Sequence, residues 1–300
     1  MSQPPSGSPS PPAAPVPAVS AAPVEPTSYA APASQAQAGT GPAPPRFCNT
    51  CGAPLHPDWV DACPHCAARH ARALQAPAAS IAKNTPINSA IALYFAFLGA
   101  SVVMMIAIFA GANAVTTDFV ISALCSVLVV AWCVVARRDV APALARSGNP
   151  LWYPAAIGGA VATFTIASIA LFLLSHLLHV PQLRMTDEFV HQGYRLPTLI
   201  LCIAVQPGVI EELAFRGVIL TGLQHVLSPW ESIFVSALMF MIIHLSVPSF
   251  PHLFVIGMAL GWLRVQTGSL YPGMLLHFTH NLLCVVFELW RPFDGITFPW

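Results

Sequence analysis

A series of long apolar segments, beginning near Ile87, constrains the fold of this chain more than any other feature. A run of about 20 apolar residues can cross the hydrocarbon core of a bilayer as a helix. Backbone polar groups in that core must be paired within the protein, which favours helices. The sequence therefore predicts an all-α polytopic membrane protein with about seven transmembrane helices. The predicted segments are residues 87–111, 118–136, 152–178, 196–223, 230–247, 250–265 and 270–290.

The composition supports this fold class and excludes others. Charged residues make up 8% of the chain and hydrophobic residues 56%, whereas an average soluble domain has about 25% charged residues. A soluble protein of this composition would expose large apolar patches. The formal net charge is zero, which gives no electrostatic basis for binding nucleic acid. We therefore expect the lipid bilayer as a partner and exclude an ordinary soluble enzyme and a nucleic-acid-binding protein.

The residues before the first apolar segment differ sharply from the rest. Thirteen of the 30 prolines precede Arg46, and Glu25 is the one charged residue in that stretch. Such a sequence cannot bury enough apolar area to fold. The predicted domains are a disordered Pro/Ala-rich tail (1–45), a compact cysteine-containing module (46–72), a linker (73–86) and a transmembrane domain (87–300).

Basic residues predict the orientation in the membrane, because Lys and Arg are enriched in cytoplasmic segments. They precede the first apolar segment and follow the second, whereas the connection at 113–117 has none. This pattern predicts a cytoplasmic N-terminus in a multi-pass protein of the cell (inner) membrane. The basic residues concerned are Arg46, Arg69, Arg72, Lys83, Arg137, Arg138 and Arg146.

The eight cysteines form two groups. Four lie singly in apolar segments and are expected to be packing residues. The other four, Cys48, Cys51, Cys63 and Cys66, form two CxxC pairs separated by eleven residues. Two such pairs complete tetrahedral sulfur coordination of a structural zinc, which predicts a zinc ribbon with no open position for catalysis. Two disulfides or an iron centre are the alternatives. A protein partner could bind this ribbon or the Pro-rich tail.

Charged residues also occur inside the fourth apolar segment, where an ionisable group is costly unless it is paired or hydrated. The segment contains Glu211, Glu212 and Arg216. Glu212 and Arg216 are one helical turn apart and can pair, whereas Glu211 points about 100° away. Pro207 and Gly208 precede them and interrupt the helical hydrogen bonding. A carboxylate in such surroundings can act as a base.

Two further segments carry polar residues. His244 lies in the fifth segment, and His277 and Asn281 lie one turn apart in the seventh, with His280 beside them. A lone histidine in a membrane helix is often a hydrogen bond between helices, and we favour that role for His280. The other polar residues of the three segments are more simply explained by convergence on one hydrated cavity.

Three motifs in this order, EELAFRG, FMIIH and HFTHN, resemble those of the CPBP intramembrane proteases. That family includes the type 2 CAAX prenyl endopeptidases and the bacterial Abi proteins. The resemblance covers residues 196–290, and the segment GSLYPGMLLHFTHN looks like the last motif helix of that family with its Gly-Ser lead-in. It implies an endopeptidase that hydrolyses a peptide or membrane-protein substrate with an activated water and forms no covalent intermediate.

The resemblance also implies roles for six residues, which are Glu211, Glu212, Arg216, His244, His277 and Asn281. Glu211 and His244 would hold and deprotonate the water, and His277 and Asn281 would stabilise the oxyanion. Glu212 and Arg216 would fix the helix. In a second version of the mechanism, which we favour, Glu211, His244 and His277 hold a catalytic divalent metal, with zinc as the candidate. The expected enzyme is therefore an intramembrane metalloendopeptidase.

Two other functions remain open at this stage. One is a catalytically silent membrane scaffold, or a bacteriocin-immunity-type factor, that interacts through its zinc ribbon. The other is a transporter that relays protons through the Glu/His cluster. A transporter would be expected to show an inverted repeat, and none is visible in the sequence.

Overall fold

The computed structural model describes residues 46–47, 54–55, 63, 85–178 and 184–290. Two short strands, β1 (Arg46–Phe47) and β2 (Pro54–Leu55), pair antiparallel with Arg46 opposite Leu55. The predicted tail and the linker up to residue 84 lie outside the described residues, as do Cys48, Cys51 and Cys66. The zinc ribbon and the disordered tail therefore stay predictions.

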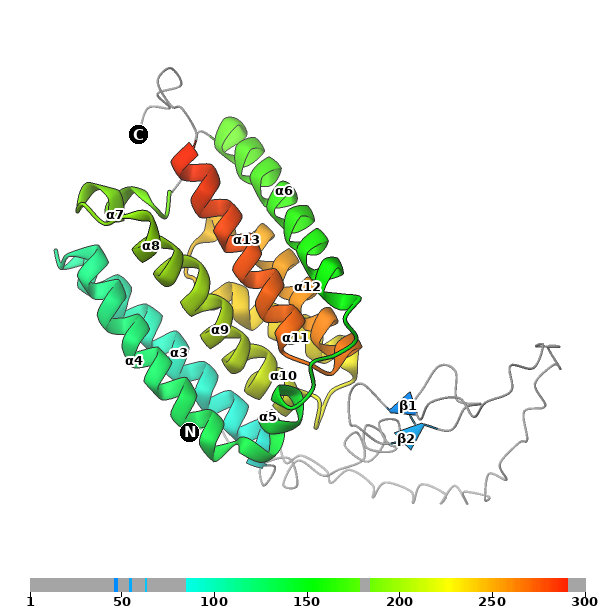
Figure 1. The fold of residues 1–300 in the computed structure, drawn as a ribbon. Helices are drawn as coiled ribbons and strands as arrows, with labels where there is room; N and C mark the ends of the chain where they lie inside the picture. The colour runs from blue at the N-terminus through cyan, green and yellow to red at the C-terminus, as the bar shows by residue number, and fades with distance from the viewer. Residues whose placement is uncertain (1–45, 48–53, 56–62, 64–84, 179–183, 291–300) are drawn as a thin grey trace, which may run out of the picture. The chain divides into compact units, whose positions relative to one another are not determined.

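The rest of the described chain is helical (Figure 1). All seven predicted apolar segments are helices. Two long helices, α3 (Thr85–Phe109) and α4 (Ala114–Val135), are followed by the short α5 (Arg137–Leu144) and the long α6 (Trp152–Leu178). After α7 (Asp187–His191) come the fourth segment, α11 (Pro229–Ile243), the 3₁₀ turn η3 (Val247–Ser249), α12 (Phe250–Thr267) and α13 (Tyr271–Trp290).

Five helices in the described part of the chain are long and apolar enough to cross a membrane, so this is a multi-pass membrane protein. They are Thr85–Phe109, Ala114–Val135, Trp152–Leu177, Leu196–Leu223 and Tyr271–Trp290. The fifth and sixth predicted segments, α11 and α12, are not among these five. The count of seven spans therefore stays a prediction.

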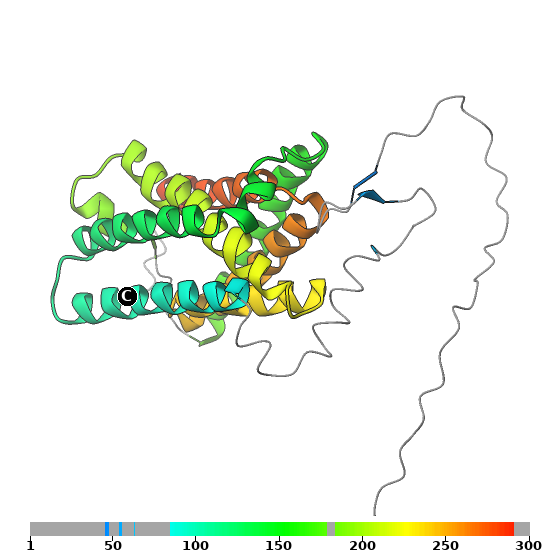
Figure 2. The same ribbon diagram turned by 90° about the horizontal axis from the view of Figure 1, so that it is seen from below.

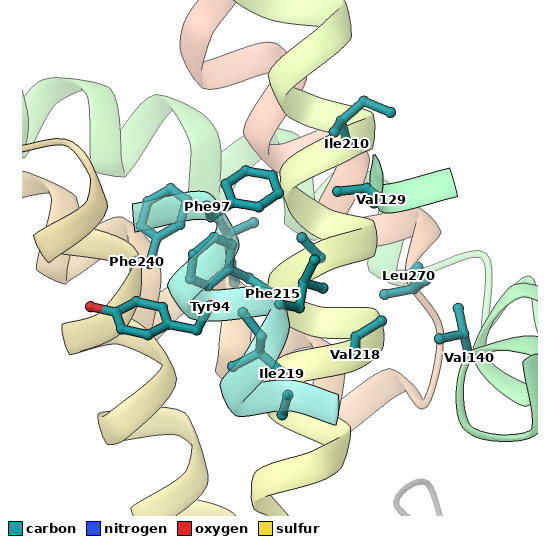
Figure 3. Close-up of a cluster of buried hydrophobic side chains, with 14 of the residues drawn as sticks. Tyr94, Phe97, Val129, Val140, Ile210, Phe215, Val218, Ile219, Phe240 and Leu270 are labelled. Atoms are coloured by element: carbon teal, nitrogen blue, oxygen red, sulfur yellow. The ribbon is translucent and has the colours of Figure 1, made fainter. Parts of the chain in front are cut away.

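The helix Leu196–Leu223, called the fourth span below, is the central element. Of the 18 consecutive residues that form its most apolar stretch, 44% are buried inside the protein, compared with 11–28% in the other four helices. It packs against α13 on one side and against α3 and α4 on another. Figures 1 and 2 show the same neighbours from two directions. Figure 3 shows its side chains Phe215, Val218 and Ile219 surrounded by core residues of several other helices. Side chains on the fourth span are therefore in contact with other helices on several sides.

The fourth span is not a uniform α-helix. It consists of α8 (Leu196–Leu199), a π segment η1 (Ile200–Val205), α9 (Gln206–Glu212), a second π segment η2 (Leu213–Ile219) and α10 (Leu220–Leu223). Pro207 lacks the N–H that would continue the α-helical ladder. Pro207 and Gly208 lie in the first turn of α9, and the two widened turns lie directly before and after this segment. Such turns occur often at functional sites.

The fifth predicted segment, 230–247, ends earlier than expected. Helix α11 begins with a capping box between Ser228 and Glu231 and ends at Ile243, with His244 as its C-cap. Leu245 follows with φ +51°, in the left-handed region that ends helices. His244 therefore lies at a helix end instead of deep within the helix.

Gly208 permits the close approach of α9 and α13. A Cβ at this position would lie 3.1 Å from the backbone nitrogen of Phe278, the residue after His277. We predict that Gly208→Ala lowers the free energy of unfolding by about 1–3 kcal/mol because two backbones must separate. Gly158→Ala is the matched control, because Gly158 lies in helix α6 with nothing within 4 Å of the added methyl group. Thermal unfolding in detergent measures both; equal stability of the two variants would contradict this account.

Candidate functional site

A buried ion pair lies at the centre of the candidate site. Arg216 Nη1 donates a hydrogen bond to Glu212 Oε1 at 2.8 Å, and the residues are 1% and 0% exposed. Arg216 Nη2 donates to the carbonyl of Gly257 in α12 at 3.1 Å. The guanidinium also lies over the Phe240 ring, 4.7 Å from its centroid. The predicted pairing of Glu212 with Arg216 is confirmed, and Arg216 also links the fourth span to α11 and α12.

His277 of α13 joins this pair. Its Nδ1 lies 3.0 Å from Glu212 Oε1, the oxygen that also accepts from Arg216. A carboxylate oxygen can only accept, so Nδ1 carries the proton. The other ring nitrogen, Nε2, lies 3.9 Å from Oε2 of Glu211. Residues of the first and third motifs are thus brought together, with Glu212 and Glu211 on opposite nitrogens of one imidazole.

Glu211 differs from Glu212 in its surroundings. Its side chain is 19% exposed, whereas that of Glu212 is fully buried. Its Oε2 atom has no hydrogen-bond partner within the described part of the chain. The two adjacent carboxylates therefore have the separate orientations that helix geometry predicts. Glu212 is used by hydrogen bonds within the protein, whereas Glu211 can bind a ligand or water.

His244 also contacts the ring of Phe240. Its Nδ1 donates to the carbonyl of Phe240 at 2.8 Å, which leaves Nε2 without a proton in the neutral ring. The ring centroid of Phe240 is 4.9 Å from that of His244 and 5.8 Å from that of His277. His244 is an exposed residue at the end of α11. Both histidines contact one aromatic ring, and His244 is the more accessible.

Asn281 fixes α13 to the fourth span. Its Nδ2 donates to the carbonyl of Ile203 at 2.9 Å. In a regular α-helix this carbonyl would accept from the N–H of residue 207, which is a proline. Asn281 therefore donates to a carbonyl whose α-helical partner, residue 207, has no N–H. The predicted spacing of His277 and Asn281 on one face of α13 directs both side chains to the fourth span.

His280 lies in a different environment. It is 5% exposed, and its Nδ1 lies 3.0 Å from the hydroxyl of Thr163 in α6. This contact is a hydrogen bond between α13 and α6, which is the structural role favoured from the sequence.

The sequence interpretation did not single out His252 in α12. Its Nδ1 is buried without a hydrogen-bond partner among the described residues. The sequence does mark His252 as a candidate, because it is an ionisable residue in an apolar segment.

The chemistry of the histidines suits metal ligation, but their spacing does not. A metal-bound imidazole usually donates its second N–H to a carbonyl or a carboxylate, as His244 and His277 do here. Within the described residues, however, no three His, Cys, Asp or Glu side chains form a group that could hold a metal ion. For the predicted ribbon ligands, Cys63 is described and its three partner cysteines lie outside the described residues.

Comparison with known families identifies this region. Residues 193–283 match a family model described as type II CAAX prenyl endopeptidase Rce1-like. Comparisons with curated proteins and with solved structures gave no match. The matched residues begin just before the fourth span and end within α13, so they contain all three motifs and the buried Glu212–Arg216–His277 cluster. Residues 193–283 of this chain are therefore similar to the Rce1-like family of type II CAAX prenyl endopeptidases, and this match covers about a third of the chain.

Proposed function

We propose that this protein is an intramembrane endopeptidase of the CAAX prenyl protease type 2/Abi-like class. The observation that carries the proposal is the pairing of an available carboxylate, Glu211, with the Nε2 edge of His277 at 3.9 Å. Behind it, the buried Glu212–Arg216 pair holds the imidazole in place. A base with a fixed neighbouring donor is what hydrolysis by an activated water requires.

In the proposed mechanism Glu211 and His244 hold a water molecule. Glu211 takes one proton as the water oxygen adds to the carbonyl carbon of the substrate. When the C–N bond breaks, Glu211 returns this proton to the leaving nitrogen, so protons balance over the cycle. The support for this role is that Glu211 Oε2 and His244 Nε2 are not used by any hydrogen bond within the described chain.

His277 and Asn281 would stabilise the oxyanion formed when water adds. His277 can donate from Nε2 only when both ring nitrogens carry protons. Glu212 Oε1 lies 3.0 Å from Nδ1, and Glu211 Oε2 lies 3.9 Å from Nε2, so each ring nitrogen faces a carboxylate. Asn281 has a second Nδ2 hydrogen beyond the one donated to Ile203. In this proposal His277 and Asn281 each make one hydrogen bond within the protein and one to the oxyanion.

The proposed substrate is a peptide or a membrane-protein segment that reaches the site from the bilayer. The family description supports a segment that ends in a CAAX sequence. We also propose that residues 46–72 bind a structural zinc through Cys48, Cys51, Cys63 and Cys66 on the cytoplasmic side of the cell (inner) membrane. The antiparallel strands β1 and β2, which flank the first CxxC pair, support a compact module there.

Chelation separates the two versions of the mechanism. A divalent metal, if present, would be held by Glu211, His244 and His277 and would activate the bound water. Because these donors do not form a group that could hold an ion in the described structure, we expect the purified full-length protein to keep most of its cleavage rate after chelation. Zinc in the ribbon is counted separately by elemental analysis. Loss of cleavage on chelation, restored by Zn²⁺ in a chain whose ribbon zinc is unchanged, would instead establish a metalloendopeptidase.

A further inference from the structure

Arg264, in the last turn of α12, is a buried cation that the proposed hydrolysis does not use. It is 8% exposed, and its Nε is buried without a hydrogen-bond partner among the described residues. No ion pair to a carboxylate is formed by Arg264 within that part of the chain. Arginine is rarely buried without a partner, because an uncompensated charge is costly away from water.

The charged group that acts on Arg264 has the same sign. It is Arg146, in the connection between α5 and α6. This connection is held against the end of α12 and the start of α13. Ser269 Oγ donates to the carbonyl of Arg146, and Leu270 N donates to the carbonyl of Ala143 at 3.3 Å. These two hydrogen bonds hold the connection that carries Arg146 against the residues that directly follow α12, the helix that carries Arg264.

Aromatic residues place this pair at the end of the membrane-embedded helices. Trp152 and Trp262 meet edge to face with centroids 5.7 Å apart, and Trp262 and Tyr271 are 39% and 40% exposed. Partly exposed Trp and Tyr at helix ends are typical of the interface between lipid and water. Figure 1 shows α5 at the end of the bundle where α13 begins. A ligand that reaches Arg264 here is at headgroup level.

We propose that Arg264 and Arg146 bind the phosphate of an anionic phospholipid. Phosphate oxygens accept several hydrogen bonds from guanidinium groups in fixed geometry. Basic pockets between transmembrane helices are known positions for anionic headgroups. The dipole at the end of α12 also favours a cation there, but the buried Nε of Arg264 has no hydrogen-bond partner among the described residues. The bound phosphate supplies the missing negative charge, and this site does not depend on the proposed protease function.

The test uses full-length protein in nanodiscs of phosphatidylcholine with or without phosphatidylglycerol. Thermal unfolding is followed by tryptophan fluorescence, and bound lipid is counted by native mass spectrometry. We expect phosphatidylglycerol to raise the Tm of the wild type, and Arg264→Gln and Arg146→Gln each to weaken its binding about fivefold, which is the contribution of one basic residue near the membrane surface. Arg138→Gln is the control, because Arg138 is an exposed arginine at the start of α5 and should behave as wild type.

The Tm of Arg264→Gln relative to that of the wild type should also depend on the lipid. In a phosphate-free non-ionic detergent it should melt above the wild type, because a buried unpaired charge is removed, and this advantage should vanish when phosphatidylglycerol is added. If this variant fails to fold, Arg146→Gln carries the test, because its side chain is on a partly exposed connection. Unchanged lipid preference in Arg146→Gln, or an equal loss in Arg138→Gln, would overturn the proposal. So would inorganic phosphate that stabilises the phosphatidylcholine sample as much as the anionic lipid does.

Discussion

Replacement of Arg216 by methionine is expected to lower the free energy of unfolding by about 3–5 kcal/mol, because it leaves a buried carboxylate without its partner. Arg216 is 1% exposed and contacts Glu212, the carbonyl of Gly257 and the ring of Phe240. The loss therefore affects the fourth span, α11 and α12 together. Thermal or denaturant unfolding in detergent gives the difference between variant and wild type.

A double substitution separates the charge from the packing. Arg216→Met combined with Glu212→Gln removes both charges and keeps much of the volume, so it should recover a large part of the lost stability. Since His277 hydrogen-bonds to the same oxygen of Glu212, the double variant should still be impaired in cleavage. A single Arg216→Met variant as stable as the wild type would show that Glu212 is not charged in the folded protein.

Glu211→Gln is expected to lower the rate of peptide cleavage by about 10²–10⁴-fold, the usual contribution of a general base. The amide has nearly the same shape as the carboxylate but cannot accept the proton from water. Because Glu211 Oε2 has no hydrogen-bond partner within the described residues, stability should change little. Rates and unfolding of the same preparation are compared.

Asp118→Asn provides the control for this variant. Asp118 is another partly buried carboxylate in a membrane-spanning helix, α4, where it accepts from Ser122 at 3.5 Å. It lies outside the three motifs, so the same chemical change should leave cleavage near the wild-type rate. Equal losses in Glu211→Gln and Asp118→Asn would mean that any charge removed from the membrane impairs the protein, and that Glu211 has no special role.

Local features of the fold followed from the sequence, because they depend on spacing alone. The limits of 152–178 and 196–223 agree with the helices at those positions. The pairing of Glu212 with Arg216 followed from four-residue spacing. The interruption at Pro207 could be predicted from the missing N–H. The π form of the turns around it could not, because periodicity alone does not distinguish a widened turn from a regular one.

Long-range contacts in the candidate site required the structure. His277 and Glu212 are 65 positions apart, and nothing in either segment indicates which imidazole nitrogen meets which carboxylate oxygen. The bond from Asn281 to Ile203 likewise depends on how α13 packs on the fourth span. The end of α11 at Ile243 was missed because the left-handed conformation occurs at a leucine, Leu245, and not at a glycine.

The most direct test of the proposed activity is the mass of the products formed by wild-type protein. Purified full-length chain in detergent is incubated with peptides that end in a CAAX sequence, with and without a prenyl group. We predict a single internal cut in at least one peptide, with product masses that add up to the substrate plus one water, and no such cut by Glu211→Gln. A folded wild-type protein that leaves every peptide intact would contradict the account, as would a Glu211→Gln variant that gives the same products at the same rate.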